Sequence, residues 1–429
     1  MNAIARFFEF EQRQTTLARE MRGGVTTFLT MAYIIAVNPL ILANAGISVT
    51  AAATSTALAA GVCCIAMGLF ANFPIALASG MGLNAMVAFQ ITAATGSWQA
   101  AMGLVVLDGL LILLLVLVGL REAVLRAIPR ELRIAIGAGI GLFIAVIGLQ
   151  GAKIIVASPV TMVTAGSFQN RETLIASVGL IVTAVLMIRK VTGALLLGIL
   201  LATTLALWLG VTSLPDRFPR PDFSAMFQAD VPAVLQWRYL PLLLSIVMID
   251  FFDTLGTASA VAEQGRLADG DGNIPRVRRL LIVDSAAASL GGAMGASSNT
   301  SFIESAAGVA EGARTGLHSV IVGLLFLLAA IVAPLATVVP ASATAPALIL
   351  VGFLMMSQVA EIDFKRLENA VPAFITILTI PLTFSIAHGI GYGFVAYVVL
   401  NLLTGHFRRV HPLMYVVAAA FVAYFAAGY

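Results

Sequence analysis

Apolar runs of roughly 17 to 25 residues recur along the whole chain, and each is long enough to cross a bilayer core of ~30 Å as a helix. Hydrophobic residues make up 60% of the sequence and charged residues only 10%. A soluble protein would carry roughly a quarter charged residues. The runs lack the alternation of period two that a transmembrane β-barrel needs. The sequence therefore predicts an all-α polytopic membrane protein.

We place fourteen transmembrane segments along the chain, in two sets of seven. A polar, proline-rich stretch at 213–232 separates the sets. A further apolar run at 412–428 has no counterpart in the first half, and it either spans the membrane or packs at its surface. The predicted segments lie near 23–44, 52–72, 74–96, 98–119, 129–149, 172–188, 191–210, 239–262, 277–293, 294–312, 316–338, 341–357, 370–387 and 388–404.

The distribution of charge sets the orientation of these segments. With the N-terminus in the cytoplasm, most of the 24 Lys and Arg residues fall on the cytoplasmic side, as the positive-inside rule requires. Because seven is odd, the two sets have opposite orientations, which is the inverted repeat common in secondary transporters. The net charge of +3 is modest and indicates orientation rather than nucleic-acid binding. The predicted parts are a cytoplasmic tail (1–22), the first repeat (23–212), an extracytoplasmic linker (213–238), the second repeat (239–405), and a C-terminal tail or extra apolar helix (406–429).

Both repeats contain an irregular segment at the corresponding place. The third segment carries "LASGMGLNAMVAF" at 77–89, and its counterpart carries "GGAMGASSNTSFIESAAG" at 291–308. Within a bilayer, non-helical backbone is tolerated only where protein or a water-filled cavity covers it. Broken segments at matching positions of two repeats point to a binding site near the bilayer midplane.

Five acidic residues fall inside predicted segments, and each costs at least ~2.5 kcal/mol if it faces lipid near the bilayer centre. We therefore expect them to face the protein interior, a cavity or a partner. They are Asp108, Asp250, Asp253, Asp284 and Glu304.

Asp250 and Asp253 are three residues apart and so lie on one side of their helix, which Thr254 and Thr257 extend. Two acids this close in a dry site cannot both ionise cheaply, and we expect one to hold a proton. Such a pair suits a proton-coupled carrier. In the alternative, one Asp binds the solute while the other accepts hydrogen bonds from a neighbouring broken helix.

The remaining polar candidates have both functional and structural interpretations. Glu304 follows the most irregular stretch, where it either lines a cavity or caps a helix N-terminus. Asn84 occupies the corresponding place in the first repeat, where it either meets a solute or satisfies broken backbone. We interpret Asp284 as bracing the adjacent segment rather than relaying protons. Asp108 stands alone in a uniform apolar run, and we interpret it as structural.

Other motifs do not indicate an enzyme. Cys63 and Cys64 are neighbours in an apolar run, which favours packing over redox chemistry. Gly137 and Gly141 predict close helix packing rather than a nucleotide-binding loop. Ionised carboxylates only accept hydrogen bonds, and each can take two parallel N–H donors. The inward acids therefore suit a planar solute with adjacent N–H groups, or a small cation, better than an anion.

Several strings form a specific set across nearly the whole chain. They are "REMRGGVTTFLTMAYIIAVNPLIL" (19–42), "SGMGLNA" (79–85), "DFFDTLGT" (250–257), "SNTSFIESAAGV" (298–309), "RTG" (314–316) and "SATAPALI" (342–349). In these strings the sequence resembles the guanine/hypoxanthine/adenine permease branch of the nucleobase–cation symporters. The related uracil/xanthine branch shares the architecture.

The resemblance implies a core domain of segments 1–4 and 8–11 and a gate domain of segments 5–7 and 12–14. It also implies short antiparallel strands in the third and tenth segments, which meet at the substrate. The implied site residues are the base-binding acids Asp253 and Glu304, with Phe302 against the ring, Asn84 in the third segment, Asp250, and Asp284 in the ninth segment. A histidine of the uracil branch is replaced here by Thr257, so the implied proton carrier is a carboxylate among Asp250, Asp253, Glu304 and Asp284.

The resemblance further implies a secondary transporter that imports a purine nucleobase by proton symport, through rocking or elevator motion of the core against the gate. Its partners would be the purine, the proton as coupling ion and the lipid bilayer of the inner membrane, with a homodimer left open. No other cofactor and no metal is expected. The alternatives are an anion exchanger or channel on the same scaffold, and uracil or xanthine specificity. The sequence does not separate guanine, hypoxanthine and adenine.

Overall fold

The computed structural model describes residues 3–119, 128–267, 274 and 276–426. Within these residues, eight helical stretches are long and apolar enough to cross a membrane. They are Leu17–Ala45, Val49–Ala71, Trp98–Leu117, Arg130–Gly151, Arg171–Ile188, Trp237–Gly265, Ala341–Glu361 and Ile386–Leu403. Four shorter apolar helices accompany them. The helical polytopic class that the sequence predicts is confirmed.

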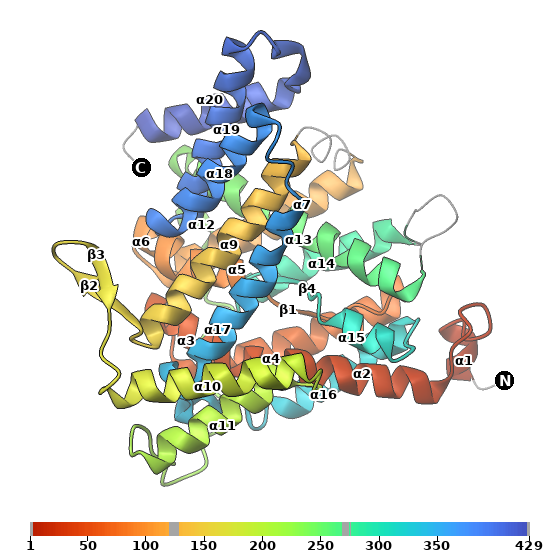
Figure 1. Ribbon diagram of the computed structural model, residues 1–429. Helices are drawn as coiled ribbons and strands as arrows, with labels where there is room; N and C mark the ends of the chain where they lie inside the picture. Colours follow the sequence, from red (N-terminus) through yellow and green to blue (C-terminus); the bar gives the residue numbers. More distant parts are fainter. Residues whose placement is uncertain (1–2, 120–127, 268–273, 275, 427–429) are drawn as a thin grey trace.

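The first half of the chain alternates long helices with one broken stretch. Its elements are α1 (Ala3–Phe7), α2 (Leu17–Met31), α3 (Ile34–Leu42), α4 (Val49–Ala66), β1 (Leu77–Ser79), α5 (Met81–Ala85), α6 (Thr92–Thr95), α7 (Trp98–Leu117), α9 (Arg130–Gly151), β2 (Ile155–Ser158), β3 (Met162–Ala165), α10 (Arg171–Ile188) and α11 (Ala194–Trp208). The β2–β3 hairpin, which the sequence analysis did not predict, projects from the body of the molecule (Figure 1).

The second half also contains long helices and one broken stretch. Its elements are α12 (Val231–Val234), α13 (Leu240–Gly265), α14 (Val277–Ala293), β4 (Asn299–Ser301), α15 (Ser305–Ala310), α16 (Gly316–Ala329), α17 (Ala341–Met356), α18 (Leu367–Leu382), α19 (Ile386–Leu403) and α20 (Pro412–Ala426). In each half, a three-residue strand leads into a short helix: β1 into α5 and β4 into α15. The two strands pair with each other in antiparallel orientation, so the expected strands of the third and tenth segments are present.

Two predicted boundaries are wrong. Segments 370–387 and 388–404 were expected to meet near 387, but α18 ends at Leu382 and α19 begins at Ile386. Phe384 has a positive φ of 53°, which breaks the helix, and the Ser385 side chain then accepts a hydrogen bond from the N–H of His388. A serine N-cap of this kind starts a new helix.

The predicted N-terminal tail (1–22) contains the start of the first long helix. α2 begins at Leu17, where Thr16 caps the helix by accepting from the N–H of Arg19. Buried Glu20 accepts hydrogen bonds from the N–H groups of Arg314 and His318 at the start of α16. A carboxylate at a helix N-terminus satisfies otherwise unpaired donors, and this contact fixes the tail against the second half of the chain.

The helices pack in two groups. In one group, α16 contacts α2 and α4, while α14 contacts α7. In the other, α17 and α18 pack along α9, α10 contacts α11 and α17, and α19 contacts α18 and α20. Figure 1 shows α9 and α17 running side by side through the centre, with the β1–β4 pair beside them. The division into core and gate domains that move separately remains a prediction.

Gly141 allows a close contact between α9 and α17. A Cβ atom at Gly141 would lie 2.7 Å from the carbonyl oxygen of Gly352, and a Cβ at Gly352 would lie 2.4 Å from the carbonyl oxygen of Gly141. The predicted role of Gly141 in close helix packing is therefore confirmed. Gly137, one turn earlier, instead has only Gln358 near its Cβ position.

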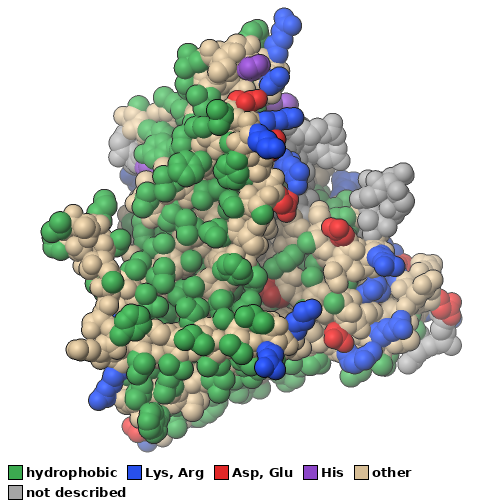
Figure 2. Space-filling view, in the orientation of Figure 1, with side chains coloured by type: hydrophobic (Ala, Val, Ile, Leu, Met, Phe, Trp, Pro, Cys, Tyr) green, Lys and Arg blue, Asp and Glu red, His purple; other side chains and the backbone are tan. Residues whose placement is uncertain are grey.

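The outer surface of the helices is strongly apolar. Large side chains such as Ile188, Trp208 and Leu403 are about four-fifths exposed (79%, 80% and 80%). Figure 2 shows hydrophobic side chains over the left and centre of the molecule, while Lys, Arg, Asp and Glu gather along its right-hand edge. A continuous apolar surface of this extent is unusual for a soluble monomer and suits a lipid environment.

Candidate functional site

The β1–β4 pair joins the two broken segments at the centre of the molecule. Leu77 pairs with Ser301 and Ser79 with Asn299. Beyond the strands, the N–H of Gly80 donates to the carbonyl oxygen of Ser298 at 2.9 Å, and the N–H of Phe302 donates to that of Ala76 at 2.9 Å. Because these bonds satisfy the irregular backbone, both segments can end inside the protein and leave helices α5 and α15 on either side of the strands.

Asp253 of α13 faces an open space beside the strands. Its side chain is exposed, and its Oδ2 accepts a hydrogen bond from the hydroxyl of Thr300 on β4 at 3.2 Å. Thr257, one turn further along α13, lines the same space. The carboxylate thus stands at the surface of a cavity, with one oxygen held by the strand.

Glu304 follows β4 and directly precedes α15. Its Oε1 accepts a hydrogen bond from the hydroxyl of Tyr33 at 2.7 Å, and the residue is half-buried. Tyr33 lies at the break between α2 and α3. The hydroxyl of Tyr33 holds Oε1 of the carboxylate and makes no hydrogen bond to Oε2.

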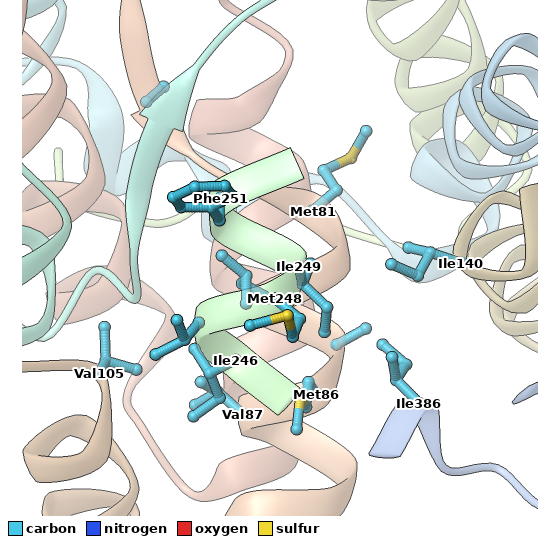
Figure 3. Close-up of a cluster of buried hydrophobic side chains, with 14 of the residues drawn as sticks. Met81, Met86, Val87, Val105, Ile140, Ile246, Met248, Ile249, Phe251 and Ile386 are labelled. Carbon is cyan, nitrogen blue, oxygen red and sulfur yellow. The ribbon is translucent and has the colours of Figure 1, made fainter. Parts of the chain in front are cut away.

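Asp253 and Glu304 line one cavity of about 450 Å³ between the two groups of helices. Its walls come from Tyr33, β1–α5, α9, α13, β4–α15 and α17. Much of the lining is apolar and includes Met81, Ile140 and Ile249 together with buried Phe302. Figure 3 shows Met81 and Ile140 among the buried hydrophobic side chains on one side of α13. A largely apolar cavity of this size with a few polar groups is typical of small-molecule sites.

The other predicted site residues lie behind the cavity wall and do not line it. Asp284 of α14 accepts hydrogen bonds from Ser301 of β4 at 2.7 Å and from Thr254 of α13 at 2.6 Å. This contact braces β4 against α13. Asn84 is fully buried, and its Nδ2 donates to the carbonyl oxygen of Ser79 at 3.4 Å.

Asp250 does not share the cavity with Asp253. Its Oδ2 accepts a hydrogen bond from the hydroxyl of Ser298 at 2.8 Å, and the residue is buried. On its other side, the carboxyl group interacts with that of Asp108 on α7. Asp108, interpreted from the sequence as an isolated structural residue, is therefore the acid that contacts Asp250.

The sequence analysis missed three polar residues of the cavity. Tyr33 holds Glu304, while Arg133 of α9 and Gln358, which follows α17, lie in the lining. Arg133 lies one turn inside the predicted apolar segment 129–149. A phenol and a guanidinium at such positions are the signal that could have identified them.

Comparisons with known proteins agree with this arrangement. A family model of xanthine/uracil type, described as the Permease family, matches residues 18–392. The guanine/hypoxanthine permease PbuG of Bacillus subtilis is 42% identical over 98% of this chain and 98% of its own length. The adenine permease AdeQ of Escherichia coli is 40% identical over 97% of this chain and 95% of its own length.

Solved structures resemble the fold at low sequence identity. The transmembrane domain of the cyanobacterium bicarbonate transporter BicA superimposes with a TM-score of 0.65 at 18% identity, covering 86% of this chain and 97% of that domain. The murine Solute Carrier 26 family member A9 anion transporter, in the inward-facing state, superimposes with a TM-score of 0.64 at 13% identity. The match covers 91% of this chain and 69% of that transporter chain. These likenesses show the fold alone.

Proposed function

The chain belongs to the Permease family of xanthine/uracil type, and from this we propose that it imports purine nucleobases. Members of the family are multi-pass membrane transporters and not enzymes. The relatives named guanine/hypoxanthine and adenine permeases, which match along almost their whole length, support a purine as the substrate.

One observation carries the proposal at the site: two carboxylates from different elements converge on one cavity beside an aromatic ring. Asp253 and Glu304 provide the acceptors, and Phe302 provides the ring. A purine presents N–H donors along one edge and a flat face for stacking. Each carboxylate can accept paired N–H donors, and an aromatic side chain stacks on a base at a favourable energy.

Transport would follow from relative motion of the two groups of helices. Fourteen crossings in two inverted sets of seven would form a core around β1, β4 and α13 and a gate around α9 and α17. The cavity lies between elements of both groups, so movement of one against the other would expose it to alternate sides of the membrane. In a bacterial inner membrane with the N-terminus in the cytoplasm, the positive-inside rule is met.

We further propose that a proton is the coupling ion. Asp250 and Asp284 are buried beside the strands, and a carboxyl group can bind or release one proton without a metal or a histidine. If proton binding raises the affinity for the purine, purine binding raises the affinity for the proton by the same factor, because thermodynamic linkage is reciprocal. Accumulation of purine would then follow the proton gradient.

Two alternatives make different predictions. An anion exchanger on the same scaffold would bind a negative solute, which Asp253 and Glu304 would repel, although Arg133 lies in the same cavity. A uracil or xanthine carrier would prefer other hydrogen-bonding edges in a similar cavity. An uptake assay that separates these alternatives therefore tests bicarbonate, uracil and xanthine as well as the purines.

The test is uptake by proteoliposomes that contain the purified protein. Labelled hypoxanthine should accumulate when an inward proton gradient is imposed, and unlabelled guanine, hypoxanthine or adenine should compete where uracil and bicarbonate do not. Collapse of the proton gradient should stop accumulation. Competition by uracil alone would reject purine specificity, and dependence on sodium instead of protons would reject the coupling ion.

A further inference from the structure

Two buried carboxyl groups meet between α7 and α13, away from the cavity. Asp108 on α7 is 0% exposed and Asp250 on α13 is 1% exposed, and α7 and α13 pack against each other. The two carboxyl groups interact with each other across this contact. Neither residue lines the cavity that holds Asp253 and Glu304. The pair is thus a separate feature of the molecule.

Three of the four carboxyl oxygens of this pair lack hydrogen-bond donors from the rest of the described protein. Within the described residues, no N–H or O–H group donates to either oxygen of Asp108 or to Oδ1 of Asp250. Ionised carboxylates only accept hydrogen bonds, so two of them in contact would leave three buried oxygens without donors. One shared proton makes one carboxyl a donor to the other. It also removes the repulsion between two charges in a dry site.

The surroundings offer no positive charge that would replace the proton. Asp284 on α14, which packs on α7, acts electrostatically on both members of the pair and is itself an acid. Asp230, before α12, contacts α7 at Gly103, more than one turn from Asp108. Arg278 contacts the far end of α7, at the carbonyl oxygen of Leu117. Within the described residues, no basic side chain donates a hydrogen bond to either oxygen of Asp108 or to Oδ1 of Asp250.

Asp250 connects the pair to the strand that carries the cavity residues. Its Oδ2 accepts from Ser298, whose carbonyl oxygen accepts from Gly80 at the end of β1. Ser298 directly precedes β4, on which Thr300 donates to Asp253. A change of charge at the pair therefore acts on the backbone between the two strands.

We propose that Asp108 and Asp250 form the coupling site, which binds one proton separately from the carboxylates that bind the solute. With the proton bound, the carboxyls stay in contact and Ser298 holds β4 in place. When the proton leaves, two anions face each other, and their separation displaces Ser298 and the start of β4. Asp108 acts as a positioning and proton-sharing residue and does not touch the solute. This inference rests on the proposed proton-coupled import.

Asp108→Asn tests the proposal, because the amide can donate to Asp250 and replace the proton permanently. In proteoliposomes, the variant should exchange labelled for unlabelled hypoxanthine as the wild type does. It should lose accumulation driven by the proton gradient, so that the inside-to-outside ratio falls to about 1, since an uncoupled carrier only equilibrates its solute. Asp108→Glu, which retains an acid, should restore part of the accumulation.

Infrared spectroscopy of the purified protein tests the shared proton without any transport assay. The wild type should show a carbonyl stretching band of a protonated carboxylic acid, which both Asp108→Asn and Asp250→Asn remove and Glu263→Gln leaves unchanged. Wild-type accumulation by Asp108→Asn, or an infrared band that both variants retain, would overturn the proposal. If the wild type shows the band but carries no purine, the proposed function fails while the proton-holding pair stands.

Discussion

A single hydroxyl group holds the carboxylate of Glu304 in place at the cavity. Tyr33 donates to Oε1 at 2.7 Å and comes from the break between α2 and α3, far from Glu304 in the sequence. Hydrogen bonds to charged groups contribute about 1.5–3 kcal/mol. The orientation of the acid at the cavity therefore depends on a residue of another element.

Tyr33→Phe should weaken purine binding about 10- to 100-fold, because each 1.4 kcal/mol corresponds to a factor of ten in affinity. The ring is retained, so packing should not change. The measurement is the dissociation constant of hypoxanthine for the purified variant, with its melting temperature as the control for folding. Unchanged affinity would mean that Tyr33 does not orient Glu304 for binding.

The sequence identified the acids of the site because a carboxylate inside an apolar run is costly unless it is covered. It did not identify their partners. From the sequence, Asp250 and Asp253 either act together or divide their roles, with one of them accepting hydrogen bonds from a neighbouring broken helix. In the structure Asp250 accepts from Ser298 of the broken segment, while Asp253 faces the cavity. Contacts between segments distant in the sequence depend on packing, which periodicity does not reveal.

At the scale of elements, the β1–β4 pair depends on side chains around it. Two strands of three residues are too short to be stable alone. Ser305, at the start of α15, accepts a hydrogen bond from the N–H of Ala76 just before β1 at 2.9 Å. Asp284 holds Ser301 of β4 from the other side. These bonds close the backbone network that the broken segments need.

Ser305→Ala should destabilise the protein by about 1–3 kcal/mol, because it leaves the buried N–H of Ala76 without its acceptor. The measurement is the thermal unfolding of the purified variant in detergent. Ser357→Ala, at an exposed position after α17, is the matched control and should unfold as the wild type does. Equal melting temperatures for the two variants would show that this bond contributes nothing to stability.

The contact between α9 and α17 depends on the absence of side chains at Gly141 and Gly352. Gly141→Ala should cost about 1–3 kcal/mol because its Cβ would meet the backbone of α17 at 2.7 Å. Gly137→Ala on the same helix meets only Gln358 Oε1, at 3.6 Å, and should be tolerated. Thermal unfolding measures the melting temperature of both variants. A lower melting temperature for Gly137→Ala than for Gly141→Ala would contradict this packing.

Long helices were predictable from the sequence, while short elements were not. The apolar runs located α7, α9, α10 and α13 closely because each needs only length and hydrophobicity. The β2–β3 hairpin was missed, and the boundary between α18 and α19 was placed too late. Those features depend on turn geometry and capping, which hydrophobicity alone does not encode.

At the scale of the whole molecule, the two groups of helices approach each other closely at one edge of the cavity. A Cβ at Gly82 of α5 would lie 3.9 Å from the Cβ of Ile140 on α9. Disulfide-bonded cysteines have Cβ atoms 3.5–4.5 Å apart. This contact links the proposed core to the proposed gate and must break if they move against each other.

The double variant Gly82→Cys/Ile140→Cys should transport purine when reduced and stop when oxidised, because the disulfide would fix the two groups together. Cys63 and Cys64 are buried, so wild-type protein treated with the same oxidant is the control. Uptake before and after reduction measures the effect. Full transport by the cross-linked variant would show that the two groups do not move apart at this contact.

The proposed purine import depends most on Asp253 and Glu304, which would bind the purine in the cavity between the two groups of helices. Equilibrium binding of labelled guanine, hypoxanthine and adenine to the purified protein in lipid nanodiscs tests it directly. Asp253→Asn and Glu304→Gln should each abolish binding, whereas Glu263→Gln, an exposed position on the same helix as Asp253, should bind as the wild type does. Wild-type affinity in both cavity variants would contradict the account.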